Sequence, residues 1–484
     1  MNVNPITRLD YPDPDVIRVE DTYYMVSTTM HFMPGCEILQ SFDLVHWEHV
    51  TYVYETLDHT DAQQLKSGQN IYGQGMWAAS LRYHEGRFYI CFVANDTRKT
   101  YLYTSEKIDG PWKKQLIEGF YHDGSLLFDE DGRNYIVYGN DEIWITELNE
   151  DLTAPKKDGL HRLLVSDHKN PELGYEGSHI QKINGYYYIF LVHSLRDRWM
   201  RTEACFYSDS LEGEFTGGDV LCDDRGYCGQ GVAQGGIVDT PDGKWYAMLF
   251  QDSGAVGRIP ILLPVTWKDH FPVFGQNGHV PEEIEVHSTR PGYIYQPLVG
   301  SDDFCNGLLP RWQFNHDPDP RYYHLDALQG TYTITTREVC TELTQAVNTL
   351  TQRMSYPSCA AEVTVDASAL KEGDVAGLCA LQGCYAAVGI TKHHGKYEVL
   401  MLDKKEDGIL DMTEGNVVES HQIDFRLEAD FCNMKDEARC YYRVNKGDWL
   451  PIGTVHKLYF KLDHFTGCRF GLFCYAAEET GGSA

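Results

Sequence analysis

Gly185-Tyr-Tyr-Tyr188-Ile, a turn glycine followed by an aromatic-rich strand, is one of five copies of a short pattern in the first half of the chain. The other copies are Asp21-Thr-Tyr-Tyr24-Met, Gly86-Arg-Phe-Tyr89-Ile, Gly132-Arg-Asn-Tyr135-Ile and Gly243-Lys-Trp-Tyr246-Ala. Their tyrosines recur at intervals of roughly 50 residues, which is the length of a β-propeller blade. A β-sandwich can also carry such turns, but the repeat favours an all-β fold with a five-bladed propeller over residues 1–295.

A second regularity lies upstream of the repeated tyrosines. About twelve residues before each of them, at positions that should be equivalent in the blades, stand Asp13, Trp77, Asp123, Glu176 and Gln234. The first strand of each blade lines the central channel of a propeller, so equivalent positions converge on the axis. The sequence therefore predicts that three carboxyl groups from three blades meet there.

Three convergent carboxyl groups suit the hydrolysis of a glycosidic bond. In an inverting enzyme one acid protonates the leaving oxygen and a second activates water, at a separation of roughly 6.5–9.5 Å. A third acid beside the proton donor would raise the donor's pKa and orient it. A calcium site is the alternative interpretation, although calcium loops usually gather their acids at close sequence spacing. Any one Asp beside Pro or Gly is more often a turn residue.

Composition narrows the class of partner. The net charge of -30 argues against nucleic acid, because phosphate binding requires clustered Lys and Arg. Residues 1–9 lack the apolar core of a signal peptide, and no stretch reaches the roughly 18 apolar residues of a membrane span. The 14 cysteines show no metal-type CxxC pair, as expected of reduced thiols. We expect a cytoplasmic protein with an oligosaccharide substrate and no nucleic-acid or membrane partner; a homo-oligomer is left open.

The motifs resemble glycoside hydrolase family 43, the family of β-xylosidases and α-L-arabinofuranosidases. The residues that carry this resemblance are Tyr11-Pro-Asp13-Pro-Asp15-Val-Ile-Arg18, Tyr23-Tyr24-Met-Val-Ser27-Thr28, Pro34-Gly35 and Ser41-Phe-Asp43-Leu-Val-His-Trp47. The resemblance implies that Asp13 is the general base and that Glu176 is the general acid. Asp123 would then tune the pKa of the acid and orient it.

The resemblance also implies residues that bind the terminal sugar. Arg258 would bind sugar hydroxyls and Trp77 would pack against the ring, with a sheet-edge arginine and a core tryptophan as the alternatives. His179, near Glu176, is a further candidate. Phe32 precedes Pro34-Gly35, where family members place aromatic residues, but the run Thr29-Met-His-Phe-Met33 departs from the β-xylosidase pattern.

Gln234 stands where several family members carry an axial histidine associated with a central ion or water. We expect Gln234 to bind substrate, and the sequence assigns no metal ligand. The chemistry requires no cofactor, and a structural calcium ion at the propeller axis is left open.

A second β-rich region, residues 296–484, follows a linker-like segment that runs from Pro281 to Gly292. Strand-like runs alternate there with turns, as in a β-sandwich: residues 331–335, 361–365, 397–401, 439–443 and 457–461. Residues 311–316 and 348–353 resemble the concanavalin-like sandwich that follows the propeller in many family members. In such relatives the sandwich leans over the propeller and helps to close the pocket, whereas a separate carbohydrate-binding module is the competing interpretation.

The sequence thus predicts an inverting exo-glycosidase. Its substrates would be terminal α-L-arabinofuranosyl or β-D-xylosyl residues of hemicellulose-derived oligosaccharides. One alternative is an endo-arabinanase, which would need an open groove. The other is a non-catalytic carbohydrate-binding propeller, which would have no need for an acid, a base and a tuning carboxylate together.

Overall fold

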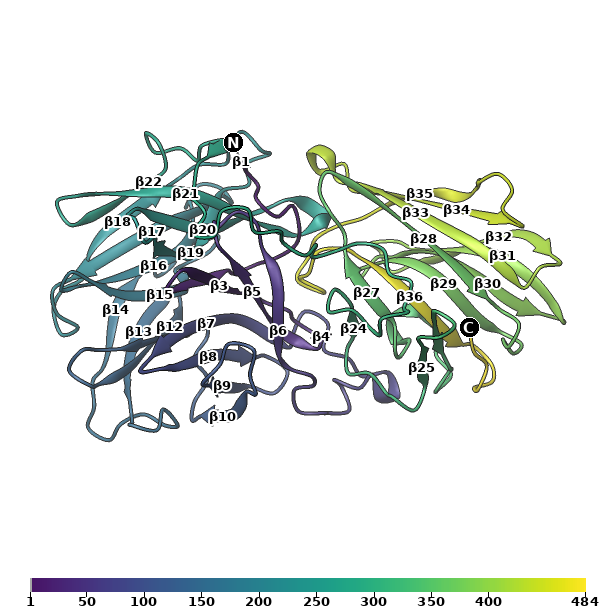
Figure 1. Ribbon diagram of the computed structural model, residues 1–484, viewed down its shortest axis with the longest axis horizontal. Helices are drawn as coiled ribbons and strands as arrows, with labels where there is room; N and C mark the ends of the chain where they lie inside the picture. The colour runs from purple at the N-terminus through teal and green to yellow at the C-terminus, as the bar shows by residue number, and fades with distance from the viewer. Residues whose placement is uncertain (1) are drawn as a thin grey trace.

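The computed structural model describes residues 2–484, which form two β-rich parts side by side (Figure 1). The N-terminal part contains five four-stranded antiparallel sheets. Their strands, from the innermost outward, are β2 (Asp15–Val19), β3 (Thr22–Val26), β5 (Gly35–Ser41) and β6 (Glu48–Tyr54); β7 (Met76–His84), β8 (Arg87–Ala94), β9 (Lys99–Ser105) and β10 (Lys113–Ile117); β11 (Ser125–Phe128), β12 (Asn134–Asn140), β13 (Glu142–Leu148) and β14 (His161–Ser166); β15 (Glu176–Ile183), β16 (Tyr186–Ser194), β17 (Arg201–Ser208) and β18 (Thr216–Leu221); β19 (Val232–Asp239), β20 (Trp245–Asp252), β21 (Arg258–Lys268) and β22 (Phe271–Phe274).

The innermost strands close into a ring. Strand β2 contacts β7, β7 contacts β11, β11 contacts β15, β15 contacts β19, and β19 returns to β2. This arrangement is a β-propeller, in which closure of the ring leaves few strand edges exposed.

The aromatic repeat falls on the second strand of each sheet. Tyr135, Tyr188 and Tyr246 are buried there, each within an apolar cluster that joins neighbouring sheets, whereas Tyr24 and Tyr89 are half-buried and pack against two further clusters of this kind. Each large aromatic ring buries roughly 150–250 Å², so the repeated residues supply much of the packing between blades. This packing explains why the pattern recurs with the blade period.

The C-terminal part is a sandwich of two antiparallel sheets. The larger sheet has the order β32 (Leu410–Val418), β31 (Lys396–Lys404), β30 (Ala386–His393), β29 (Asp374–Leu381), β36 (Arg469–Ala476), β27 (Leu350–Arg353), β24 (Gln313–Asn315) and β4 (Phe32–Met33). The smaller sheet has the order β28 (Ser358–Asp366), β33 (Gln422–Asp430), β34 (Glu437–Val444) and β35 (Leu450–Lys457). Leu378, Val388 and Met401 of the first sheet share a core with Phe425 and Leu427 of the second.

Two short pairs complete the β-structure, β1 (Asn2–Val3) with β23 (Glu283–Ile284) and β25 (Tyr323–Asp326) with β26 (Thr331–Ile334). The helices within residues 2–484 are single 3₁₀ turns: η1 (Lys66–Gly68), η2 (Gly254–Val256), η3 (Leu343–Gln345) and η4 (Cys432–Met434). None of them has the length and hydrophobicity needed to cross a bilayer.

The strand predicted over residues 457–461 is wrong. Strand β35 ends at Lys457, and the chain then leaves the sheet until β36 begins at Arg469. This segment, residues 458–468, extends to the propeller, where the ring of Phe465 lies 5.7 Å from that of Trp77. The apolar residues of this run are therefore divided: Leu458 is buried in the sandwich core, and the ring of Phe460 lies 6.0 Å from the guanidinium carbon of Arg258 in the propeller.

The two parts share a sheet. Strand β4 belongs to the propeller segment of the chain but pairs with β24 of the sandwich, with Met33 opposite Phe314 and Phe32 opposite Asn315. The last blade strand, β22, ends at Phe274 and β24 begins at Gln313. The predicted boundary between residues 295 and 296 lies in the connecting segment.

Candidate active site

The candidate site lies where the innermost strands begin. Asp13 and Asp123 precede β2 and β11 in the left-handed backbone region, with φ of 52° and 48°. Glu176 begins β15, and a β-bulge follows it before His179. Bulges re-aim side chains, and non-glycine residues with positive φ cost energy that the surrounding fold must supply. These features turn the three carboxyl groups toward one another at one end of the axis.

Asp13 is held from two sides. Thr28 donates from Oγ1 to Asp13 Oδ2 at 2.6 Å, and Arg258 donates from Nη1 to Oδ1 at 2.9 Å. Asp13 is 6% exposed and Arg258 is 2% exposed, so the ion pair is shielded from bulk water. These contacts fix the orientation of the carboxylate while one guanidinium balances its charge.

His122 connects the other two acids. Its Nε2 lies 3.4 Å from Glu176 Oε2 and 3.5 Å from Asp123 Oδ2. Asn140 donates from Nδ2 to Glu176 Oε2 at 2.8 Å, and the backbone N–H of Gly177 donates to Asp123 Oδ2 at 3.0 Å. The three side chains thus form one hydrogen-bonded cluster.

The pKa values of this cluster follow from burial and charge. Burial raises the pKa of Asp123 to about 6, assisted by the charges of Glu176 and Asp13 and opposed by His122. Burial lowers the pKa of His122, but the charges of Asp123, Glu176 and Asp13 outweigh it and bring the value to about 9.

The pKa of Glu176 moves downward. Burial raises it, but the hydrogen bond and charge of His122, with the charges of Arg201 and Arg258, outweigh burial. His122, whose pKa is the highest of the three groups, thus lies within hydrogen-bonding reach of Glu176. The predicted role of Asp123, to tune the pKa of Glu176 and orient it, stays a prediction, and His122 is an additional group that lowers the Glu176 pKa.

Arg201 was not predicted from the sequence. Its Nε donates to Asp252 Oδ2 at 2.8 Å, and Asp252 lies opposite Arg258 in the β20–β21 ladder. The guanidinium carbons of Arg201 and Arg258 lie 5.2 and 5.4 Å from the centroid of the same ring, that of Phe250. Two buried guanidinium groups thus form one wall beside the carboxyl groups.

The sandwich contributes a second wall. Phe465 places its ring 4.2 Å from the guanidinium carbon of Arg258 and 5.7 Å from the ring of Trp77. Trp77 also packs edge-on against His122 at 5.9 Å. Trp77 and Phe465 are each partly exposed beside the carboxyl groups. Both parts of the chain therefore line the site.

His179 lies one layer deeper on the axis than the carboxyl cluster. Its Nδ1 is 3.1 Å from Asp15 Oδ1, while Asp15 Oδ2 accepts from Arg82 and from the backbone N–H of Leu81, both at 2.7 Å. The oxygens of this axial carboxylate are thus occupied by protein donors. The axial calcium ion stays a prediction.

The backbone conformation of Gln234 directs its side chain toward the carboxyl cluster. Its φ is 63°, and its N–H donates to Glu203 Oε2 at 2.7 Å. Its side chain covers Gly177, where a Cβ would lie 2.7 Å from Gln234 Cγ. A glycine is therefore required next to Glu176, and the glutamine side chain packs beneath the carboxyl cluster.

Phe32 is not among the residues that the structure brings to the carboxyl groups. It lies on β4, is 1% exposed, and stacks 3.4 Å from the guanidinium carbon of Arg469. Its position in the junction with the sandwich explains the Met-His-Phe-Met departure, because the run pairs with β24.

Three residues of the site escaped sequence reasoning for different reasons. His122 is adjacent to Asp123, and that adjacency is a signal that could have identified it. Arg201 and Phe465 lie far along the chain from the acids, and only the fold brings them there. As a set, two bridged carboxyl groups and a third held by arginine can move a proton and activate water.

Comparisons with known proteins match this architecture. The family model described as "Glycosyl hydrolases family 43" matches residues 3–272, and that of the "Beta xylosidase C-terminal Concanavalin A-like domain" matches residues 301–484. The chain is 27% identical to a beta-xylosidase of Formosa agariphila, over 99% of this chain and 88% of that protein. It is 26% identical to a non-reducing end alpha-L-arabinofuranosidase of Bacteroides ovatus, over 68% of this chain and 63% of that protein.

A solved structure described as a bifunctional GH43-CE of Bacteroides eggerthii is similar throughout. It superimposes with a TM-score of 0.93 at 42% identity and covers 100% of this chain. The chain spans 62% of the length of that protein.

Proposed function

The chain belongs to glycosyl hydrolase family 43, and from this premise we propose that it removes terminal pentosyl residues from hemicellulose-derived oligosaccharides. The proposed pentosyl groups are α-L-arabinofuranosyl and β-D-xylosyl, because the similar proteins include a beta-xylosidase and an alpha-L-arabinofuranosidase. The observation that carries the proposal is the arrangement of the carboxyl groups. Carboxyl groups from three blades converge where Phe465 of the sandwich covers Arg258.

In the proposed mechanism Asp13 is the general base. Its carboxylate accepts a proton from water as the water attacks the anomeric carbon. The ion pair with Arg258 and the hydrogen bond from Thr28 orient the carboxylate. Attack from the face opposite the leaving group inverts the anomeric configuration.

Glu176 is the proposed general acid. The leaving oxygen needs a proton as the glycosidic bond breaks, and we propose that His122, whose Nε2 lies 3.4 Å from Glu176 Oε2, supplies it. A substrate oxygen beside Glu176 would draw this proton onto the carboxyl group and from there to the leaving group. Asp123, itself bound by the N–H of Gly177, would orient the pair and retain a charge that favours the protonated acid.

Cleavage at a chain end is supported by the wall that the sandwich provides. The segment 458–468 places Phe465 against Arg258 and Trp77, beside the carboxyl groups, where its ring would obstruct a long polymer lying across the axis. An endo-arabinanase needs an open groove at this point. A purely sugar-binding propeller would gain nothing from a proton-bearing histidine between two acids.

We also propose a cytoplasmic location and a simple set of partners. All 14 cysteines are free thiols, and most of them lie at sites such as Cys36, Cys91 and Cys205 where burial raises the thiol pKa. Reduced thiols persist in the cytoplasm. The net charge of -30 disfavours nucleic acid, which leaves the oligosaccharide as the expected partner.

The test uses nitrophenyl α-L-arabinofuranoside and nitrophenyl β-D-xyloside. We expect the wild type to release nitrophenol from one or both, and Asp13→Asn to lose about 10²–10⁴ in kcat. Proton NMR of the first product should show the inverted anomer. An inactive wild type, an Asp13→Asn variant of full activity, or a retained anomer would each refute the proposal.

A further inference from the structure

We propose that Trp199 forms the platform of a leaving-group subsite, on which the sugar next to the scissile bond stacks. This inference rests on the proposed function, because it names the part of an oligosaccharide substrate that extends out of the pentose pocket. It concerns the hairpin between β16 and β17, residues 195–200.

Trp199 lies at the rim of the candidate site. Its ring centroid is 5.3 Å from the guanidinium carbon of Arg201, which is 5% exposed and forms the wall beside the carboxyl groups. Trp199 itself is 43% exposed. The ring thus joins the buried wall on one side to solvent on the other, where the second sugar of an oligosaccharide that extends out of the site would lie.

The exposure of Trp199 is unusual for this chain. Among the described residues, Trp199 is the sole tryptophan in the group of strongly exposed large apolar side chains. A single exposed apolar residue on a surface needs no explanation by itself. An exposed tryptophan in contact with a buried arginine of the active site does need one.

The hairpin that carries Trp199 is held in place before any ligand binds. Ser194 Oγ accepts from the backbone N–H of Met200 at 2.9 Å and donates to the carbonyl of Arg198 at 3.2 Å. The backbone N–H of Leu195 donates to the carbonyl of Met200 at 3.2 Å. These bonds fix both residues that flank Trp199.

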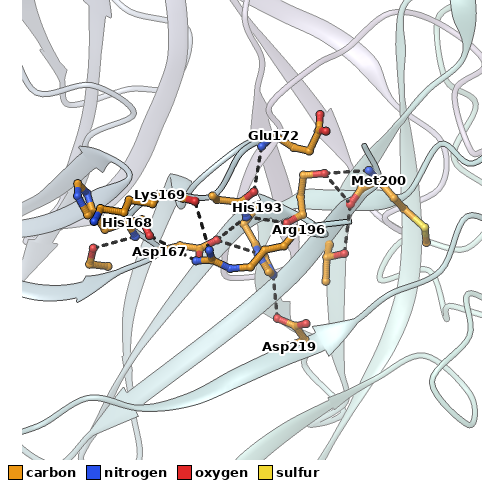
Figure 2. Close-up of polar contacts among 12 residues, drawn as sticks. Asp167, His168, Lys169, Glu172, His193, Arg196, Met200 and Asp219 are labelled. Carbon is orange, nitrogen blue, oxygen red and sulfur yellow. Dashed lines mark hydrogen bonds and ion pairs between the residues drawn. The ribbon is translucent and has the colours of Figure 1, made fainter. Parts of the chain in front are cut away.

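A second set of contacts anchors the hairpin to the loop before Glu176 (Figure 2). Arg196 pairs with the carboxylate of Asp167 and donates to the carbonyl of Lys169 at 3.3 Å. His193 bridges Asp167 at 3.2 Å and Asp219 at 2.8 Å. The hairpin and the segment that leads to Glu176 are therefore joined by several polar contacts.

The ligand chemistry follows from the side chain. One face of a pentose ring carries C–H groups, and these pack well against the flat surface of an indole, which buries a large area at low entropic cost. A preorganised platform adds affinity because little flexibility is lost on binding. Trp199 stacking selects for a sugar in the leaving-group position without requiring a particular hydroxyl pattern.

The experiment measures binding to catalytically silenced protein. Isothermal titration calorimetry gives the dissociation constants of xylotriose and of methyl β-D-xyloside for Glu176→Gln. The same two constants are measured for Glu176→Gln/Trp199→Ala. Arabinotriose and methyl α-L-arabinofuranoside serve as a second pair of ligands. We expect Trp199→Ala to weaken trisaccharide binding about tenfold and methyl glycoside binding much less. Trp199→Phe should recover most of the trisaccharide affinity.

Tyr83→Ala is the matched control. Tyr83 is 45% exposed near the end of β7, at the mouth of the axis opposite the candidate site, and its loss should leave both affinities at the parent values. Unchanged trisaccharide binding in Trp199→Ala would overturn the inference, as would equal losses for trisaccharide and methyl glycoside. A wild type that releases no pentose would overturn the proposed function instead, while the titration still reports on Trp199. Trp199→Leu repeats the test if Trp199→Ala does not fold.

Discussion

Arg258 donates from Nη1 to Oδ1 of Asp13 at 2.9 Å, in surroundings where both side chains are almost fully buried. The same guanidinium lies 4.2 Å from the ring of Phe465. One side chain thus orients the proposed base and supports the aromatic wall from the sandwich. The consequences of this geometry can be measured.

The first prediction concerns Arg258→Lys. Lysine keeps the charge but lacks the planar fork and the flat face that contact Asp13 and Phe465. We expect kcat/KM for nitrophenyl pentosides to fall about 10²-fold, because the shorter side chain would leave the buried carboxylate of Asp13 without its well-oriented partner. Arg290→Lys, at the exposed pair with Asp21, is the control and should change kcat/KM less than about twofold. Similar activities in the two variants would contradict the prediction.

The second prediction separates the acid from the base. A proton donor matters most when the leaving group is a poor one, so Glu176→Gln should lose about 10³-fold in kcat with a pentose disaccharide. With a dinitrophenyl pentoside, whose leaving group needs no proton, its loss should be far smaller. Asp13→Asn should lose activity equally on both substrates. Equal losses in Glu176→Gln would remove Glu176 from the role of acid.

The third prediction concerns the pH dependence of kcat/KM. Burial lowers the pKa of His122, but the three nearby carboxylates outweigh burial and raise this pKa to about 9. The cluster should therefore keep its catalytic proton up to that pH. The alkaline limb of the wild-type profile should therefore lie near pH 9. In His122→Asn the catalytic proton of the cluster can be held only by a carboxyl group, which loses it at lower pH. The alkaline limb of the kcat/KM profile should therefore move by about one pH unit or more toward acid pH.

The control for this profile is His161→Asn, because His161 stacks on Trp144 in the third blade and has no contact with the acids. Its limb should coincide with that of the wild type. An alkaline limb that stays in place in His122→Asn would show that His122 does not hold the proton.

The fourth prediction concerns stability. Asp436 of the sandwich packs against Gly254, where a Cβ would lie 2.6 Å from Asp436 Oδ2, and burial raises the Asp436 pKa to about 6. Because the folded carboxyl group keeps its proton to higher pH than the unfolded one, stability falls as pH rises from about 4 to 6. The cost is fully present above this window.

Asp436→Asn removes that cost. We expect its melting temperature to exceed that of the wild type at pH 8, corresponding to roughly 1–2 kcal/mol, and to match it near pH 4. Asp151→Asn, at an exposed position, should show no such divergence. A variant that melts below the wild type at pH 8 would indicate that the carboxylate makes a stabilising contact.

The sequence predicted those features that depend on a local pattern repeated with the blade period. The tyrosines of the second strands and the acids at the starts of the first strands both recur in this way, so Asp13, Asp123 and Glu176 could be placed together. Arg201 and Phe465 could not be found, because their position depends on which distant segments meet. The run 457–461 was misassigned for a related reason: the chain leaves the sheet there, so that Phe460 contacts Arg258 of the propeller while Leu458 stays in the sandwich core.

Phe32 illustrates a different limit. Aromatic residues before Pro34-Gly35 are compatible both with a sugar pocket and with a packed junction, and the choice depends on whether β24 pairs with β4. Pairing partners at long sequence separation leave no periodic signal. The backbone conformation of Gln234 is likewise set by Glu203, on a neighbouring blade.

The shared sheet formed by β4 and β24 has a consequence for protein engineering. A propeller excised from its partner would present the backbone of Phe32–Met33 as an unpaired edge and would expose the ring that Arg469 covers. Exchanging the C-terminal half for that of a homologue therefore requires a graft that re-creates a pairing strand and its arginine. The two halves should be treated as a single cassette in domain shuffling.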